Sequence, residues 1–146
     1  MTNPVDFLNI SEIVPHSKDI TLTNSSFGAW SILISGSQLA SNNDGGVGCN
    51  AMTTAVTIQN RRDSDATFSM RVYDGSAHRV MFNRTRIGGN SVLQILDKHT
   101  PVVIVRDSPG QGANSTGIEQ IQFKSDSAVN DHLTATVQYF LFDSGT

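Results

Sequence analysis

The feature that most constrains the fold is an alternation of apolar and polar residues in several short segments. The clearest case is residues 133–141, where every second residue is apolar: Leu133, Ala135, Val137, Tyr139 and Leu141. A period of two is typical of a strand with one face in a core, and it does not fit a helical stripe. Residues 67–72 and 120–124 repeat the pattern. The chain is therefore expected to form β-strands.

Turn signals separate these segments. Asp74-Gly75 predicts a tight turn, because glycine tolerates positive φ, and Gly88-Gly89-Asn90 precedes a further strand. A first strand is expected at about 29–35, with Trp30, Ile32 and Ile34 on one face. Residues 102–105 are apolar on both faces and are expected to form a central strand.

About eight short strands in 146 residues predict a single all-β domain. Its expected architecture is an antiparallel β-sandwich, jelly-roll-like, formed by residues 21–146. Residues 1–20 are apolar without a clean period and are expected to form an N-terminal arm. The arm covers either the domain's own core or a partner.

Both ends of the chain carry apolar residues outside the alternating core pattern. Phe140 and Phe142 follow polar residues on the outer face of the last strand, where they would form a patch that monomers seldom display. The arm, a sister subunit, another protein or a folded-over loop could cover them. The candidate partner or oligomer interface is Phe7, Leu8, Ile10, Ile13, Phe140 and Phe142.

The charge balance favours protein partners. The net charge of −3 gives no general attraction to nucleic acid or anionic membranes. Residues 61–86 hold six arginines against three aspartates, which indicates either a solvated face or a surface for an acidic partner. No apolar run reaches the length of a membrane span.

No catalytic constellation is evident, and we expect no enzyme, cofactor or metal site. The four histidines, at 16, 78, 99 and 132, and the lone Cys49 have no metal-ligand spacing. The glycine-rich stretches lack phosphate-binding patterns. Asp63-Ser64-Asp65 and Asn42-Asn43-Asp44 could supply oxygen ligands to calcium, but they equally suit Asx-turns.

The start of the chain, residues 1–4, lacks a basic region followed by an apolar run, so no secretory leader is expected. With Cys49 alone, no intrachain disulfide can form. These features are typical of a protein made in a reducing cytosol.

The order of strands and turns from about residue 51 to residue 143 resembles that of small β-sandwich proteins of tailed-bacteriophage particles, including capsid decoration (cement) and tail accessory proteins. The parts that carry the resemblance are 53–60, 68–75, 88–93, 101–107 and the closing 139–142. Arg106-Asp107 stands where many such proteins have Gly-Asp. The group has no catalytic residues to transfer.

The resemblance implies a virion protein made in the host cytoplasm, a trimer that binds the major capsid protein or other virion proteins. Capsid decoration is the leading hypothesis, and a head–tail or tail accessory role is the alternative. A receptor- or carbohydrate-binding module is a second class, since jelly rolls bind sugars through exposed aromatics. Trp30 and Tyr73 are its candidates, although both are expected to be half-buried.

Overall fold

The computed structural model describes residues 16–22, 28–36, 49–105, 117–126 and 133–143. This part of the chain contains nine strands and no helical element, so the all-β prediction is confirmed. The strands are β1 His16–Leu22, β2 Ser31–Ser35, β3 Cys49–Asn60, β4 Ala66–Tyr73, β5 His78–Ile87, β6 Val92–Leu96, β7 Val103–Ile104, β8 Gln120–Ser125 and β9 Leu133–Asp143.

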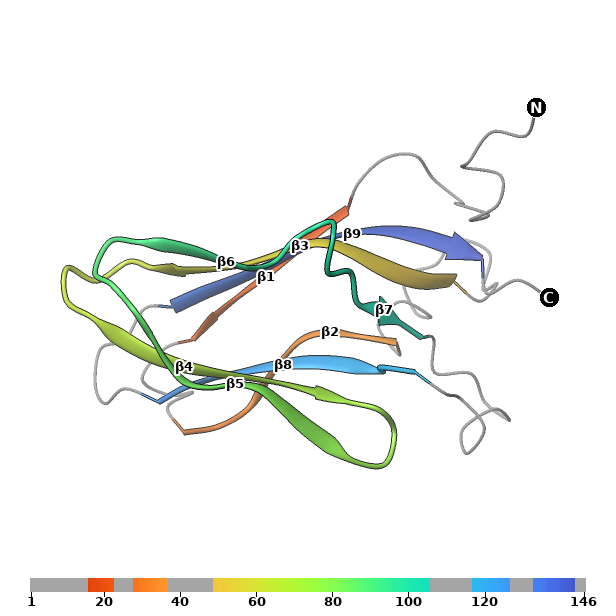
Figure 1. The fold of residues 1–146 in the computed structure, drawn as a ribbon, viewed down its shortest axis with the longest axis horizontal. Helices are drawn as coiled ribbons and strands as arrows, with labels where there is room; N and C mark the ends of the chain where they lie inside the picture. Colours follow the sequence, from red (N-terminus) through yellow and green to blue (C-terminus); the bar gives the residue numbers. More distant parts are fainter. Residues whose placement is uncertain (1–15, 23–27, 37–48, 106–116, 127–132, 144–146) are drawn as a thin grey trace.

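The strands form two antiparallel sheets that lie face to face (Figure 1). One sheet has the order β1-β9-β3-β6, with β7 also paired to β3, and the other has the order β2-β8-β4-β5. Both β6 and β7 pair with β3 and can be counted as one interrupted strand. The pairs are then β1 with β9, β2 with β8, β3 with β6 and β7, and β4 with β5, from the two ends of the chain toward its middle. A hairpin folded over in this way is a jelly roll, so the expected sandwich is confirmed.

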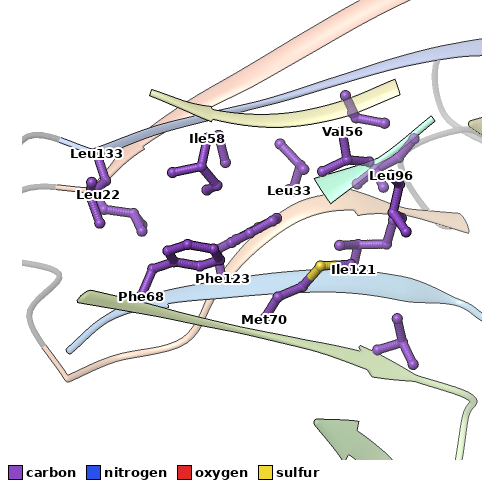
Figure 2. Close-up of a cluster of buried hydrophobic side chains, with 14 of the residues drawn as sticks. Leu22, Leu33, Val56, Ile58, Phe68, Met70, Leu96, Ile121, Phe123 and Leu133 are labelled. Atoms are coloured by element: carbon purple, nitrogen blue, oxygen red, sulfur yellow. The ribbon is translucent and has the colours of Figure 1, made fainter. Parts of the chain in front are cut away.

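The core fills the space between the sheets (Figure 2). Leu33, Ile58, Phe68, Phe123 and Leu133 are fully buried there. The Phe68 and Phe123 rings lie 6.1 Å apart between centroids, within the range of favourable aromatic pairs. Ile121 and Phe123 point inward while Lys124 does not, as the alternation predicts.

A bulge in β2 overturns the predicted faces of the first strand. The register with β8 shifts between Ile32 and Ile34, and Leu33 and Ile34 are both buried. Ile32 lies opposite the outward Gln122 and is 41% exposed. The expectation that Trp30, Ile32 and Ile34 share one face was therefore wrong, because the extra residue of a bulge reverses the alternation.

Residues 102–105 do not form the expected central strand. Only Val103 and Ile104 pair with β3, and the short strand β7 that they form has no other strand partner in the sheet. The Val102 backbone N–H donates to Thr53 Oγ1 at 2.8 Å, and the Val105 N–H donates to the Ile118 carbonyl at 2.8 Å, so the ladder ends on both sides. Ile104 is buried and Val103 is 39% exposed.

The sheet begins earlier than the expected arm boundary at residue 20. Residues 16–20 belong to β1, which pairs with β9 from His16 to Leu22, whereas residues 1–15 lie outside the described part. Lys18 stands opposite the buried Val137, and burial lowers the pKa of its ammonium group. An inward lysine on an edge strand discourages pairing with a further strand.

Asn60 joins two turns at one end of the sandwich. Its side-chain amide donates to the carbonyls of Ser64 at 2.9 Å, Gly88 at 3.1 Å and Ile87 at 3.4 Å. Its Oδ1 accepts from the Arg62 backbone N–H at 3.0 Å. The side chain is 1% exposed, so its polar groups depend on these partners.

Candidate functional site

The outer face of the β1-β9-β3-β6 sheet is built mainly from polar side chains, and we call it the threonine face. Its members are Ser17, Asp19, Thr21, Thr57, Gln59, Gln94, Thr134, Thr136 and Gln138, together with Ala55 and Val92, which is 64% exposed. The strand register aligns them in rows across the sheet, and the Thr21 and Thr134 hydroxyls lie 3.5 Å apart. Among the described residues of this face, only Asp19 carries a charge.

An apolar row continues the threonine face toward the carboxyl end of β9. Phe140 pairs with Met52, which also pairs with Val103, so these residues lie side by side on the outside of the sheet. Phe140 and Met52 are half-buried, and Val103 is more exposed. Tyr139 and Leu141 point the other way and pack against the core, as the alternation predicts.

The other predicted interface residues are not brought into this row by anything the structure describes. The Phe142 backbone pairs with Asn50, but its side chain lies outside the described part. Phe7, Leu8, Ile10 and Ile13 also lie outside the described residues. The structure places Phe140 on the outer surface, and the predicted interface stays a prediction at all six positions.

The outer face of the β2-β8-β4-β5 sheet has a different chemistry, and we call it the tryptophan face. The Arg71 Cζ atom lies 4.2 Å from the centroid of the Trp30 ring, and the Lys124 Nζ atom lies 4.9 Å from it. Both separations are those of cation–π contacts, which hold the ring over the sheet. Burial lowers the pKa of the Arg71 guanidinium.

A chain of hydrogen bonds crosses the tryptophan face. Arg71 Nε donates to Gln122 Oε1 at 2.6 Å, and Gln122 Nε2 donates to Gln120 Oε1 at 2.6 Å. Gln122 is only 6% exposed although it points away from the core. The side chains that lie over it therefore form a layer fixed to the sheet.

A second part of the network reaches the edge strand β5. Lys124 Nζ lies 3.3 Å from Asp126 Oδ1, and the Ser69 hydroxyl donates to Asp126 Oδ2. The Ser69 oxygen accepts from the Arg84 backbone N–H at 2.9 Å. Arg84 has a φ of 46° at a bulge of β5, a conformation that this hydrogen bond helps to hold.

Aromatic and apolar side chains complete the tryptophan face. The rings of Tyr73 and His78 stack with centroids 4.7 Å apart, and the Tyr73 hydroxyl donates to the Gly75 carbonyl. Ile32 and Val80 flank Gln122 and Arg71 along one row of the register. Trp30 is half-buried, as expected, but it does not share a face with the buried Ile34, and that wrong expectation concealed the gathering of these side chains.

Two of the six arginines in the stretch 61–86 are paired with aspartates of the same stretch. Arg86 forms an ion pair with Asp65, and Arg79 lies 3.6 Å from Asp74. Hydrogen bonds from the backbone of Ala77 and Ser76 lower the pKa of Asp74. The excess of three positive charges in this stretch is unchanged by the pairings, but Arg79 and Arg86 are already engaged.

The histidines and the cysteine, which were the candidate metal ligands and nucleophiles, do not lie together in the described part of the chain. His16 stacks on Tyr139, His78 stacks on Tyr73, and His99 lies in the turn held by Asp97. His132 and the Cys49 side chain lie outside the described part. Within that part, no group of three histidine, cysteine or acidic side chains is placed to hold a metal ion. The same residues include no helix long and apolar enough to cross a membrane.

No protein-family model matches the chain, and no curated protein matches it. Among solved structures, it is similar to a chain from Bacillus endospore appendages, described as disulfide-linked pili, with 7% identity and a TM-score of 0.42 over 90% of this chain and 88% of that one. It is also similar to a chain of infectious bursal disease virus, Gx strain, with 12% identity and a TM-score of 0.40 over 90% of this chain.

The chain spans 33% of the virus chain's length. Both likenesses are too low to carry an inference about relationship or role. The fold assignment accordingly rests on the strand pairing of this chain, which makes it a β-sandwich with jelly-roll topology.

Proposed function

We propose that this chain is a structural protein of a virus particle that works through protein–protein contacts and not by catalysis. In its specific form the proposal is a capsid decoration protein of a bacteriophage head, which forms a homo-oligomer, expected to be a trimer, and binds the major capsid protein. The observation that carries the proposal is the threonine face with its adjoining apolar row.

The chemistry of the threonine face supports protein contact. The centres of protein interfaces are depleted in charged residues, because burying a charge without a partner is costly. On this face, Asp19 is the single charge among the described residues, whereas the tryptophan face holds Arg71, Lys124 and Asp126. A partner that covers the threonine face buries one charged side chain of the described residues, Asp19, whereas a partner that covers the tryptophan face buries several.

The apolar row supplies the energy for such a contact. Full burial of a valine, methionine or phenylalanine side chain is worth about 1.5–3 kcal/mol relative to full exposure. Val103 is 39% exposed, and Phe140 and Met52 are half-buried, so each retains part of that amount for a partner. Repetition of a modest contact over many copies raises the total affinity through avidity.

The first experiment measures where the chain is and in what state. Sedimentation should give the mass of an oligomer, and the chain should co-purify with intact particles. Purified particles without the chain would contradict the proposal. Copy number distinguishes the two virion roles: hundreds of copies per particle are expected for decoration, whereas a few to dozens would place the chain in the tail or neck.

A matched pair of variants tests the face itself. Val103→Arg places a charge on the apolar row, and Val80→Arg places the same charge on the opposite face, where Val80 is 56% exposed. Val103→Arg should abolish oligomerisation or particle binding, while Val80→Arg should preserve both. Equal effects of the two variants, with both still folded, would remove the threonine face from the proposal.

A further inference from the structure

We infer that the tryptophan face binds an oligosaccharide, through stacking on Trp30 and hydrogen bonds from Arg71 and Gln120. This inference goes beyond the proposed function, which assigns the opposite face. It identifies a site that would leave the sandwich with one face for assembly and one for a ligand.

The position of Trp30 is the first step. Its half-buried ring lies against Arg71 and Lys124 on the outside of the sheet and does not join the core between the sheets. A fixed aromatic ring offers a flat apolar surface with a polar rim, which matches the carbon–hydrogen face of a pyranose. Since both cations hold the ring in the free protein, binding does not have to order it.

The direction of the hydrogen bonds is the second step. Arg71 uses its Nε–H on Gln122, and Gln122 uses its amide on Gln120. The Gln120 amide nitrogen stands at the end of this chain, and the terminal nitrogens of Arg71 stand near Trp30. These groups can donate to hydroxyl or acetamido oxygens, and Gln120 is half-buried, so it is reachable from solvent.

The charge balance of the face is the third step, and it favours a sugar over a nucleic acid. Lys124 is paired with Asp126, and along the neighbouring hairpin Arg79 is near Asp74 and Arg86 is paired with Asp65. Arg71 has no carboxylate partner among the described residues, but its Nε–H is used by Gln122 and its guanidinium lies against the Trp30 ring. A binder of a phosphate backbone needs several cations that are not already neutralised. A hydroxyl-rich ligand instead suits paired charges, amides and rings.

The test is direct because Trp30 is the only tryptophan in the chain. The full chain is titrated with cellohexaose, maltohexaose, the N-acetylglucosamine tetramer and sialyllactose, with a thymidine oligonucleotide as polyanion control. At least one sugar should shift the tryptophan emission in a saturable way. Binding of the oligonucleotide alone, or of none of the probes up to about 10 mM, would overturn the inference.

Variants assign the binding to this face. Calorimetry should show about tenfold weaker binding for Trp30→Ala, and about fivefold weaker binding for Gln120→Ala, which keeps the fluorescent reporter. Gln94→Ala on the threonine face is the matched control and should bind as the parent does. Unchanged affinity in folded Trp30→Ala and Gln120→Ala would refute the site. No particles are needed, so this outcome is independent of the assembly role.

Discussion

Replacing Asn60 by alanine tests whether a single buried amide holds one end of the sandwich. The substitution removes hydrogen bonds to the Ser64 and Gly88 carbonyls, the longer bond to Ile87, and the bond accepted from the Arg62 N–H. With about 1 kcal/mol for each of the three shorter bonds and none for the longest, the free energy of unfolding should fall by about 3 kcal/mol. For a domain of this size that lowers Tm by about 10 °C.

Urea unfolding followed by far-ultraviolet circular dichroism measures the loss, and the exposed Asn83→Ala is its control, expected within about 0.5 kcal/mol of the parent. Asn60→Asp adds a check on the direction of the bonds, because it keeps the acceptor for Arg62 but turns an oxygen toward the carbonyls.

The folded pKa of that new carboxyl should be raised, since burial and nearby carbonyl oxygens disfavour its charge. Relative to the parent, Asn60→Asp should therefore be unstable at neutral pH and regain stability as the pH falls through the raised folded pKa, with the gain complete at the unfolded pKa of about 4. A loss below about 1 kcal/mol for Asn60→Ala, or a pH-independent Asn60→Asp, would refute the role assigned to Asn60.

Three further changes test other parts of the fold. Gly89→Ala would place a Cβ atom 2.6 Å from the backbone of Asp63, so the free energy of unfolding, measured by thermal denaturation, should fall by about 1–3 kcal/mol. Phe123→Ala opens a cavity in the core and should lower the free energy of unfolding by about 3–5 kcal/mol, as chemical denaturation will measure. A loss of less than about 1 kcal/mol would contradict the burial of this ring. Hydrogen bonds lower the pKa of Asp97, and the one from the His99 backbone N–H has the largest effect. The stability that the Asp97 carboxylate contributes is therefore present above its unfolded pKa and is lost as the pH falls through its folded pKa. Asp97→Ala should be less stable than the parent at pH 7 and equal to it in acid, as titration of stability against pH will show.

The sequence predicts the strands well where alternation runs unbroken. In β8 and β9 the apolar set faces the core over the whole described length, because side chains of period two cannot change face without an extra residue. The Asp74-Gly75 signal is confirmed by a hairpin turn in which Gly75 has a φ of 95°. Local chemistry determined these elements.

The errors come from long-range partners. Residues 102–105 are apolar enough for a central strand, but Thr53 and Ile118 take their flanking hydrogen bonds and leave a two-residue ladder. The β2 bulge depends on how β8 sits beside it, which alternation does not encode. For the same reason the tryptophan face could not be predicted: Trp30, Arg71 and Lys124 come from three separate parts of the chain.

The pairing of β1 with β9 has a consequence for how the protein is made. Thr21 and Thr134 are in contact although 113 positions separate them in the chain. Contacts between residues so far apart in the sequence are slow to form. For this reason β-sandwiches fold in milliseconds to seconds, not microseconds. Until β9 has been synthesised, both β1 and β3 lack the strand that lies between them. The threonine face forms only after β9 has joined them, so a partner that binds this face selects copies in which β9 is in place.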